Sequence, residues 1–518
     1  MRRDVTRHDA RRAPGIVAEA HQLVATARQA FPREPRPRAL LADCARRLDQ
    51  PLRVALAGSL KAGKSTLLNS LVGQDIAPTD ATECTRVVTW YRNGSTPSVT
   101  AYAPDGSTAN VVVRRGSGTH GLTFDLERLN WNAPGPREVD HLEVEWPAAA
   151  LANTTIIDTP GTSSLSREVS LRTARLLTPD DDDRDMAGVS IPGADAVVYL
   201  LRRLDEADVR FLEQVGAGAA GAQGISGPLG VIGVVSRADE IGAGRIDALH
   251  SARDVAVRFA GELERTGLCQ AVIPVAGLLA FAAATLRQQE FAAFEALAQV
   301  PVDELSAALL SADRFARPDI VLPVPPELRA QLAERFGLFG IRMAVTLIRL
   351  GVRDSATLAA ELTNRSGVDE LRSVLDVQFA QRADQLKAHS ALTALARVLT
   401  AYPGTPADQL LPRVHTLLAD VHGFAELRLL GRLRTDELPL PADDLAELHR
   451  LIGGSGVAPH LRLGVPFDAD PRIQRAQAMA AVRKWRARAR HPLADQFTTT
   501  ACLTAARSAE GTLSLLPE

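Results

Sequence analysis

The sequence predicts an α/β domain with a mixed, mainly parallel sheet, joined to an elongated α-helical bundle. Strand-like segments alternate with helical ones from residue 52 to about 277, which is typical of a mainly parallel sheet covered by helices. Few helical segments interrupt the strands between 86 and 157, so we expect some of these strands to be antiparallel. Beyond residue 280 helical periodicity continues almost without strand signals. The predicted domains are N-terminal helices over 1–50, the α/β domain over 51–285 and a helical neck and stalk over 286–518.

Individual elements follow from local patterns. Two helices are expected over 15–31 and 38–49, separated by a proline-rich link. In the α/β domain, helices are expected over 206–215 and 245–266. Strands are expected over 52–57, 86–91, 98–102, 110–113, 141–146, 154–157, 194–201, 231–236 and 271–275.

Composition narrows the class of protein. The chain has 518 residues, of which 46% are hydrophobic, and its net charge of -2 gives no reason to expect nucleic acid as a partner. The four cysteines are far apart in the sequence and lack the spacing of a zinc site or a disulfide framework. No signal-peptide pattern follows the N-terminus, and no apolar run is long enough to span a bilayer. We therefore expect a cytoplasmic protein whose membrane contact, if it has one, is peripheral.

The first strand leads directly into a phosphate-binding loop. Gly58, Gly63, Lys64 and Ser65 fit the P-loop pattern, and an apolar helical segment follows at once. Backbone N–H groups of the loop and the positive end of the helix would bind phosphates. Lys64 would reach the β- and γ-phosphates, and the Ser65 hydroxyl would ligate Mg²⁺. The predicted binding run is Gly58, Ser59, Leu60, Lys61, Ala62, Gly63, Lys64, Ser65 and Thr66.

Two further segments are expected at the phosphates. Asp158 and Gly161 follow a predicted strand as Asp-x-x-Gly, where the carboxylate would hold Mg²⁺ through a water and the glycine amide would sense the γ-phosphate. A threonine-rich loop precedes the strand at 86–91, and a threonine hydroxyl there could join Mg²⁺ while the γ-phosphate is present. Thr85 is preferred over Thr79 and Thr82 because it lies next to the strand. The predicted metal ligands are Ser65, Thr85 and Asp158.

A base-reading motif follows the strand over 231–236. The carboxylate of Asp239 could accept hydrogen bonds from N1–H and N2–H₂ of guanine, a donor pair that adenine lacks. The usual motif has Asn or Thr and then Lys, whereas Ser236 and Arg237 occupy these positions here. The stem and planar head of Arg237 can still cover a base. The last strand ends where the amide of Ala276 could meet the guanine oxygen, so GTP and GDP are the predicted ligands.

In this order, the motifs resemble those of bacterial dynamin-like GTPases. The stretches 60–66, 76–83, 236–245 and 336–341 resemble more closely the isoniazid-inducible members of that family in mycobacteria. The resemblance implies an α/β P-loop GTPase domain on a helical stalk, hydrolysis of GTP with Mg²⁺, and work on membranes. It also implies that the helices of 1–50 pack with stalk helices after residue 340.

Catalysis in such enzymes is mostly positioning and charge neutralisation. No glutamine follows the Asp158 motif, so the resemblance implies that backbone near Thr85 and P-loop residues hold the attacking water. Lys61 lies where such loops often carry a polar or charged side chain, and it could neutralise charge in the transition state or be a surface lysine. The predicted catalytic residues are Lys61, Lys64, Ser65 and Thr85.

Membrane contact has two candidate segments, each with an alternative. The basic segment 471–491, which contains Trp485, could lie on anionic lipid or could be a stalk helix that pairs with acidic neighbours. The loop over 461–467 could be a hydrophobic tip or could pack onto the bundle. The glycines of 336–340 could form a hinge.

These expectations describe a GTPase whose cycle moves a helical stalk to remodel or maintain a membrane. The alternative is a GTP-binding adaptor that regulates a sister dynamin-like protein and hydrolyses little GTP itself. The expected partners are a lipid surface, contacted peripherally at the inner face of the plasma membrane, and a second copy or a sister dynamin-like protein. A nucleic-acid partner is not expected, because no RNA-binding module or markedly basic face is evident.

Overall fold

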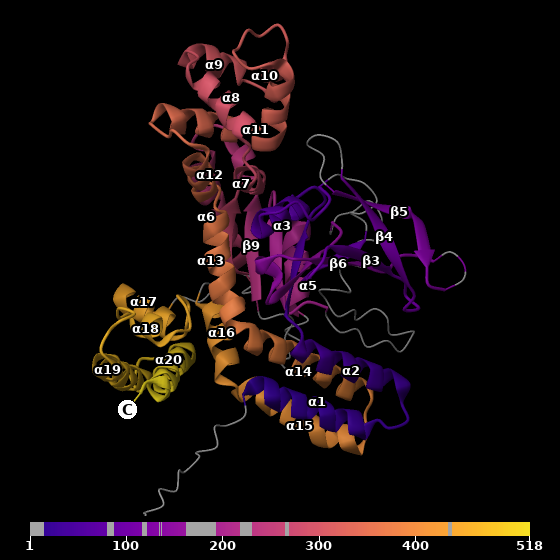
Figure 1. The fold of residues 1–518 in the computed structure, drawn as a ribbon. Coiled ribbons are helices and arrows are strands. Elements are labelled where there is room, and N and C mark those ends of the chain that lie inside the picture. Colours follow the sequence, from indigo (N-terminus) through magenta and orange to yellow (C-terminus); the bar gives the residue numbers. More distant parts are fainter. Residues whose placement is uncertain are drawn as a thin grey trace, which may run out of the picture.

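The computed structural model describes residues 15–79, 87–115, 122–133, 135, 137–161, 193–217, 230–264, 269–433 and 438–517. A sheet with its covering helices forms the middle of the molecule, and further helices lie above and below it (Figure 1). The predicted Thr85 lies outside the described residues, as does the rest of 80–86.

Ten strands form one sheet in the order β10-β9-β8-β1-β7-β2-β6-β3-β4-β5. Strands β10, β9, β8, β1 and β7 run parallel, β2 is antiparallel to β7 and parallel to β6, and β3, β4 and β5 continue in antiparallel pairs. The predicted mixed, mainly parallel sheet is confirmed, with its antiparallel part where it was expected. The strands are β1 Leu52–Gly58, β2 Val88–Asn93, β3 Ser98–Tyr102, β4 Thr108–Arg115, β5 Leu122–Trp131, β6 His141–Trp146, β7 Thr154–Asp158, β8 Ala196–Leu201, β9 Gly230–Ser236 and β10 Cys269–Val275.

The central strands are buried along their whole length, because helices cover both faces of the sheet. Every residue of β1, β8 and β9 is buried, as expected for apolar strands of a parallel sheet. Leu67, Leu68 and Leu371 belong to the core on one face, and Leu212 and Leu263 to the core on the other. The covering helices are α3 Lys64–Val72 and α13 Val368–Gln378 on the first face, and α5 Glu206–Ala217 and α6 Ala248–Glu264 on the second.

The helical remainder divides into three units, each with its own hydrophobic core. The distal unit, at the top of Figure 1, comprises α7 Gly277–Ala284, α8 Gln288–Ala298, α9 Val302–Ala308, α10 Ala312–Ala316, α11 Pro326–Arg349 and α12 Ser355–Asn364. The N-terminal bundle comprises α1 Ile16–Ala30, α2 Pro35–Asp49, α14 Ala383–Ala401 and α15 Thr405–Asp420. Helix α16 His422–Arg432 leads to the C-terminal bundle of α17 Ala442–Leu451, α18 Pro459–Leu463, α19 Pro471–Ala489 and α20 Gln496–Leu515.

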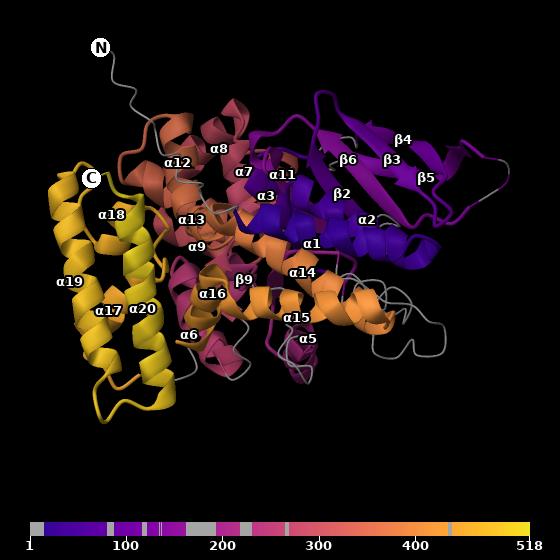
Figure 2. The same cartoon turned by 90° about the horizontal axis from the view of Figure 1, so that it is seen from below.

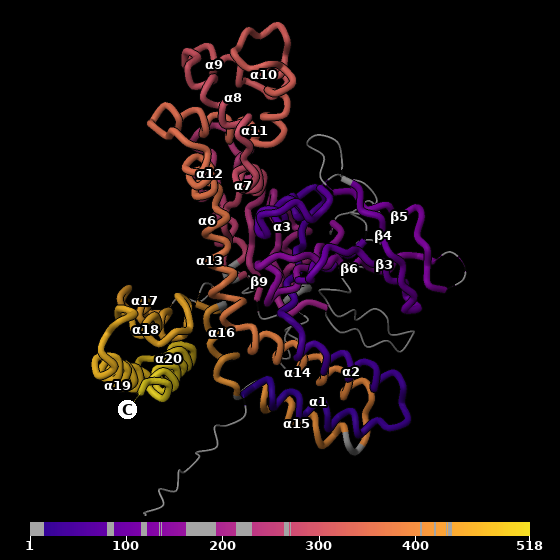
Figure 3. The backbone as a smooth tube through the Cα atoms, in the orientation of Figure 1, coloured from indigo at the N-terminus to yellow at the C-terminus, as the bar shows by residue number. Residues whose placement is uncertain are grey.

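The first helices of the chain pack against helices from beyond residue 380. The tube in Figure 3 shows α1 and α2 beside α14 and α15, and these helices share one core. Lys387 Nζ of α14 donates hydrogen bonds to the carbonyl oxygens of Leu48 and Gln50, at 3.2 and 3.4 Å. Packing of the helices of 1–50 with helices after residue 340 is thus present, and it places the N-terminal bundle directly below the sheet.

The basic helix α19 pairs with acidic neighbours inside the C-terminal bundle. It lies antiparallel beside α20 (Figure 2), and Lys484 Nζ is 2.7 Å from an oxygen of Asp444 and 2.5 Å from one of Glu447. Trp485 is fully buried, and its indole N–H donates to Glu447 at 2.9 Å. The stalk-helix interpretation of this segment is therefore confirmed, and Trp485 is not available for contact with lipid.

The loop over 461–467 is packed onto the bundle at one residue and exposed at another. Leu463 is buried in the C-terminal bundle, whereas the side chain of Phe467 is 83% exposed. None of the described helices is long and apolar enough to cross a lipid bilayer.

Candidate nucleotide site

The P-loop conformation depends on glycine at the end of β1. Gly58 has φ +143°, and a Cβ there would lie 2.4 Å from the carbonyl oxygen of Leu200 on the neighbouring strand β8. Gly63, with φ +90°, is the N-cap of α3 and turns the chain into the helix. The loop therefore opens at the carboxyl edge of the sheet, with the N-terminus of α3 facing it.

Lys64 lies at the bottom of this loop with its ammonium group buried. Its Nζ donates to the carbonyl oxygens of Gly58 and Ser59, both at 3.3 Å, and the residue is 9% exposed. Burial lowers the pKa of Lys64, and the nearby Asp158 offsets only part of this effect. A buried cation that is incompletely compensated is suited to bind an anionic phosphate.

Ser65 and Asp158 form the part of the site that fits Mg²⁺. The Ser65 hydroxyl donates to Asp158 Oδ2 at 2.7 Å, while the buried Oδ1 of Asp158 has no hydrogen-bond partner. Burial raises the pKa of Asp158, so the ionised carboxylate gains from a nearby cation. A hydroxyl next to a carboxylate oxygen with free coordinating capacity matches the ligand chemistry of hydrated Mg²⁺.

Gly161 brings the second phosphate segment against the P-loop. A Cβ at this position would lie 2.9 Å from the backbone nitrogen of Leu60, so a larger residue would push the segments apart. One cavity is lined by both segments, by Thr79 and Val87, and also by Arg237. Most of the predicted phosphate residues line this cavity: Leu60, Lys61, Ala62, Gly63, Lys64, Ser65, Thr66, Asp158 and Gly161. Gly58 and Ser59 do not line it, and their carbonyl oxygens accept from Lys64 instead.

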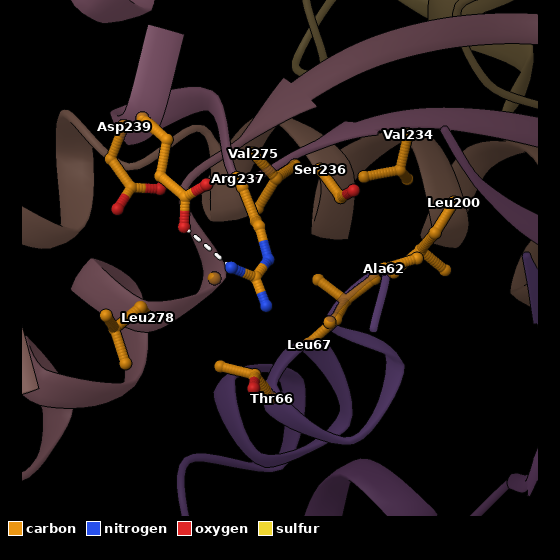
Figure 4. A pocket seen from close by; sticks show the side chains of 13 residues that line it. Ala62, Thr66, Leu67, Leu200, Val234, Ser236, Arg237, Asp239, Val275 and Leu278 are labelled. Atoms are coloured by element: carbon orange, nitrogen blue, oxygen red, sulfur yellow. Dashed lines mark hydrogen bonds and ion pairs between the residues drawn. The ribbon is translucent and has the colours of Figure 1, made fainter. Parts of the chain in front are cut away.

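The base-reading motif lines an adjoining cavity (Figure 4), in which Asp239 is 6% exposed. Burial raises the pKa of Asp239 to about 6. Ser236 lines the same cavity and donates its hydroxyl to the Leu201 carbonyl oxygen at 3.3 Å. The apolar walls come from Leu67, Leu200, Val234, Val275 and Leu278.

Arg237 joins the two cavities. Its side chain points between Asp239 and the start of α3 in Figure 4, and it lines both the base cavity and the phosphate cavity. Glu240 accepts from Arg237 Nη1 at 2.7 Å and from Arg202 Nη2 at 3.3 Å, which fixes the guanidinium head. Glu240 was not predicted as a site residue, although its position three residues after Arg237 was a usable signal.

Ala276 is not placed as the sequence predicted. Its backbone N–H donates to the carbonyl oxygen of Ser366 at 2.8 Å, because the start of α13 lies against the end of β10. The next two residues, Gly277 and Leu278, line the base cavity instead.

Backbone strain is concentrated at this site. Among the described residues, the non-glycine residues with positive φ are Lys61, Arg237 and Ala243. Lys61 lines the phosphate cavity, and Arg237 and Ala243 lie at the two ends of the loop that carries Asp239. Non-glycine residues in this conformation persist where the surrounding structure fixes them, and they cluster at functional sites.

Comparison with known proteins finds one matching family and several relatives. Residues 54–215 match the Dynamin family. The chain is 55% identical over 465 residues to the isoniazid-induced protein IniC of Mycobacterium tuberculosis, and the match covers 90% of each protein. It is 29% identical over 251 residues to the isoniazid-induced protein IniA of the same species, and this match covers 47% of the chain and 33% of IniA. A solved structure described as "An oligomerised bacterial dynamin pair provides a mechanism for the long-range sensing and tethering of membranes" is 12% identical, with a TM-score of 0.29 over 96% of this chain and 79% of that one.

The relation to IniC extends over both the nucleotide site and the helical units. It agrees with the resemblance of the short motif stretches to the isoniazid-inducible proteins. The chain therefore belongs to the dynamin family, as a bacterial dynamin-like protein close to IniC.

Proposed function

We propose that this protein binds Mg²⁺-GTP and hydrolyses it to GDP and phosphate, and that the cycle moves the helical units to remodel or maintain a membrane. One observation carries the nucleotide assignment: Arg237 lines both the cavity that contains Asp239 and the cavity formed by the P-loop. The two cavities form one site with a buried carboxylate for a base at one end and a buried ammonium group for phosphates at the other. This arrangement fits a guanine nucleotide.

The residues of the chain contribute to GTP hydrolysis mainly by supplying charge and by positioning the reacting groups. Lys64 binds the phosphates from below, and Lys61 neutralises charge that develops in the transition state. Ser65 and Asp158 would hold Mg²⁺, with Thr85 as the further proposed ligand, and the ion would add positive charge at the phosphates when bound. Backbone groups near Thr85 and in the P-loop orient the attacking water.

The proposed membrane role is supported by membership of the family. With it we propose a cytoplasmic protein that contacts the inner face of the plasma membrane peripherally. Phe467 is the candidate for direct lipid contact because its side chain is 83% exposed at a bundle loop. Phe467→Glu should then reduce co-sedimentation with anionic liposomes, while Leu493→Glu, at another exposed apolar position (86%), serves as a matched control.

The paired side chains of α19 favour a second candidate function. Since Lys484 and Arg486 bind acidic residues within the bundle, much of the positive charge of this helix is already neutralised. The protein would then be a GTP-binding adaptor that acts through a second copy or a sister dynamin-like protein.

GTP turnover by purified protein separates the two functions. Turnover that liposomes stimulate supports the membrane-acting GTPase, and turnover that needs an added dynamin-like partner supports the adaptor. Lys64→Ala is the control and should remove the turnover that depends on nucleotide bound to this chain, with turnover by the partner alone measured separately. Absence of turnover above this control, with liposomes and partner both present, would contradict the proposed hydrolysis.

A further inference from the structure

Helix α11 bends directly beside the base-reading carboxylate. The bend is at Gly337, whose φ of 62° and ψ of 175° interrupt the helix in a conformation that is essentially confined to glycine. A Cβ on Gly337 would lie 3.6 Å from Asp239 Oδ2. The predicted hinge segment therefore contains a real bend, and the bend forms one wall beside Asp239.

The end of the base-reading loop packs against the same bend of α11. Gly244, with φ +67°, ends the loop, and a Cβ there would lie 3.3 Å from the backbone nitrogen of Phe339 and 3.4 Å from Leu338 Cβ. A larger residue at Gly244 would press on α11 and require a shift of a few tenths of an ångström. At Gly337 the added Cβ would only touch Asp239, and its cost would come from the backbone conformation that favours glycine. Residues 237–244 and α11 consequently pack as one body.

Arg342, five residues beyond the bend in α11, connects the base-reading loop to a second helix of the distal unit. Its Nη1 donates to the Gly244 carbonyl oxygen at 2.5 Å and lies 3.4 Å from that of Ala243, and its Nη2 donates to the Leu309 carbonyl oxygen at 2.5 Å. Leu309 is the C-cap of α9. One planar guanidinium therefore bridges the loop that carries Asp239 and the end of a helix in the distal unit.

We propose that Arg342 and Gly337 are positioning residues for guanine recognition, which hold Asp239 at the distance and angle needed to accept both N1–H and N2–H₂. This inference rests on the proposed function, because it assumes that Asp239 binds guanine. It adds that selectivity for the base depends on contacts between the GTPase domain and the distal unit. A shift of the distal unit would therefore change affinity for the base more than affinity for the phosphates.

The test compares GDP with IDP, which lacks the 2-amino group that the second oxygen of Asp239 would bind. Loss of a hydrogen bond to a charged group corresponds to about tenfold in affinity. Arg342→Ala should therefore lower the GDP/IDP affinity ratio at least about fivefold, measured by titration calorimetry. Arg342→Lys keeps the charge without the planar fork and should restore the ratio only in part.

Arg349→Ala is the matched control. Arg349 lies on the same helix and also donates to carbonyl oxygens of the distal unit, those of Ala298 and Val300, but no described contact joins it to the base-reading loop. This variant should leave the GDP/IDP ratio unchanged. Equal losses of GDP and IDP affinity in Arg342→Ala would overturn the inference, because a general disturbance of the fold would not distinguish the two bases.

A double-mutant cycle separates this inference from the proposed function. If Arg342 acts through Asp239, Arg342→Ala should change the GDP/IDP ratio less than twofold when Asp239→Ala is already present. An unchanged ratio in Asp239→Ala alone would refute base reading itself. A ratio that falls in Asp239→Ala but not in Arg342→Ala or Arg342→Lys would refute only the positioning role.

Discussion

Binding of guanine nucleotide should weaken as the pH is lowered through 6. Burial raises the pKa of Asp239 from 3.8 to about 6, and only the ionised carboxylate can accept from both guanine donors. At pH 5 about one molecule in ten is ionised, so the apparent Kd for GDP should rise about tenfold between pH 8 and pH 5. Titration calorimetry of the full chain with GDP at several pH values measures this change.

In the nucleotide-free protein, ionisation of Asp239 should lower the free energy of unfolding, whereas it strengthens the binding of guanine nucleotide. Because the folded-state pKa of Asp239 lies above its ordinary value, ionisation destabilises the fold as the pH rises from about 4 to 6. Guanine donors offset this penalty, so GDP should raise the melting temperature more at pH 8 than at pH 5.

Asp239→Asn is the control for both measurements, because it keeps the phosphate ionisations but removes the carboxyl group. Its residual GDP binding should lack the additional tenfold loss at low pH. The same pH profile for the variant and the unmodified protein would refute the assignment of this titration to Asp239.

Substitutions of the two P-loop lysines and of the buried Trp485 have distinct expected outcomes. Lys64→Ala removes the buried ammonium group and should abolish measurable GTP binding in calorimetry. Lys61→Ala should retain GTP binding and lower GTP turnover at least about tenfold. Equal loss of GTP binding in both variants would contradict their different roles. Trp485→Ala should lower the free energy of unfolding by about 3–5 kcal/mol in urea titration, since its fully buried ring fills the core of the C-terminal bundle. Because the GTP site has a separate core, GDP affinity at 25 °C should stay unchanged in this variant, and its loss would show that the two regions are coupled.

The parts of the site that were predictable from sequence lie in short, continuous motifs. Gly58 to Ser65 and Asp158 follow apolar strands, and the carboxyl ends of parallel strands meet at one edge, so the chain order alone brings them together. Strand β5 was missed although Leu122, Phe124 and Leu126 alternate with polar residues, because two charged residues follow Leu126 and the alternation resumes out of phase at Leu129 and Trp131.

The contacts that the distal unit and α13 make with the base-reading site were not predictable from the sequence. The backbone hydrogen bond from Ala276 to Ser366 depends on how α13 packs on the sheet. The short distance between Gly337 and Asp239 depends on how the distal unit packs there. Likewise, the division of the helical region into three cores follows from packing that a period of 3.6 residues does not specify.

The central claim is that Asp239 reads guanine at a site shared with the P-loop. Affinities for GTP, ATP and XTP, measured on the unmodified protein and on Asp239→Asn, test it most directly, because an amide at this position can donate to the 2-oxygen of xanthine. We expect the unmodified protein to prefer GTP and the variant to prefer XTP. An unchanged preference for GTP in Asp239→Asn would contradict the account.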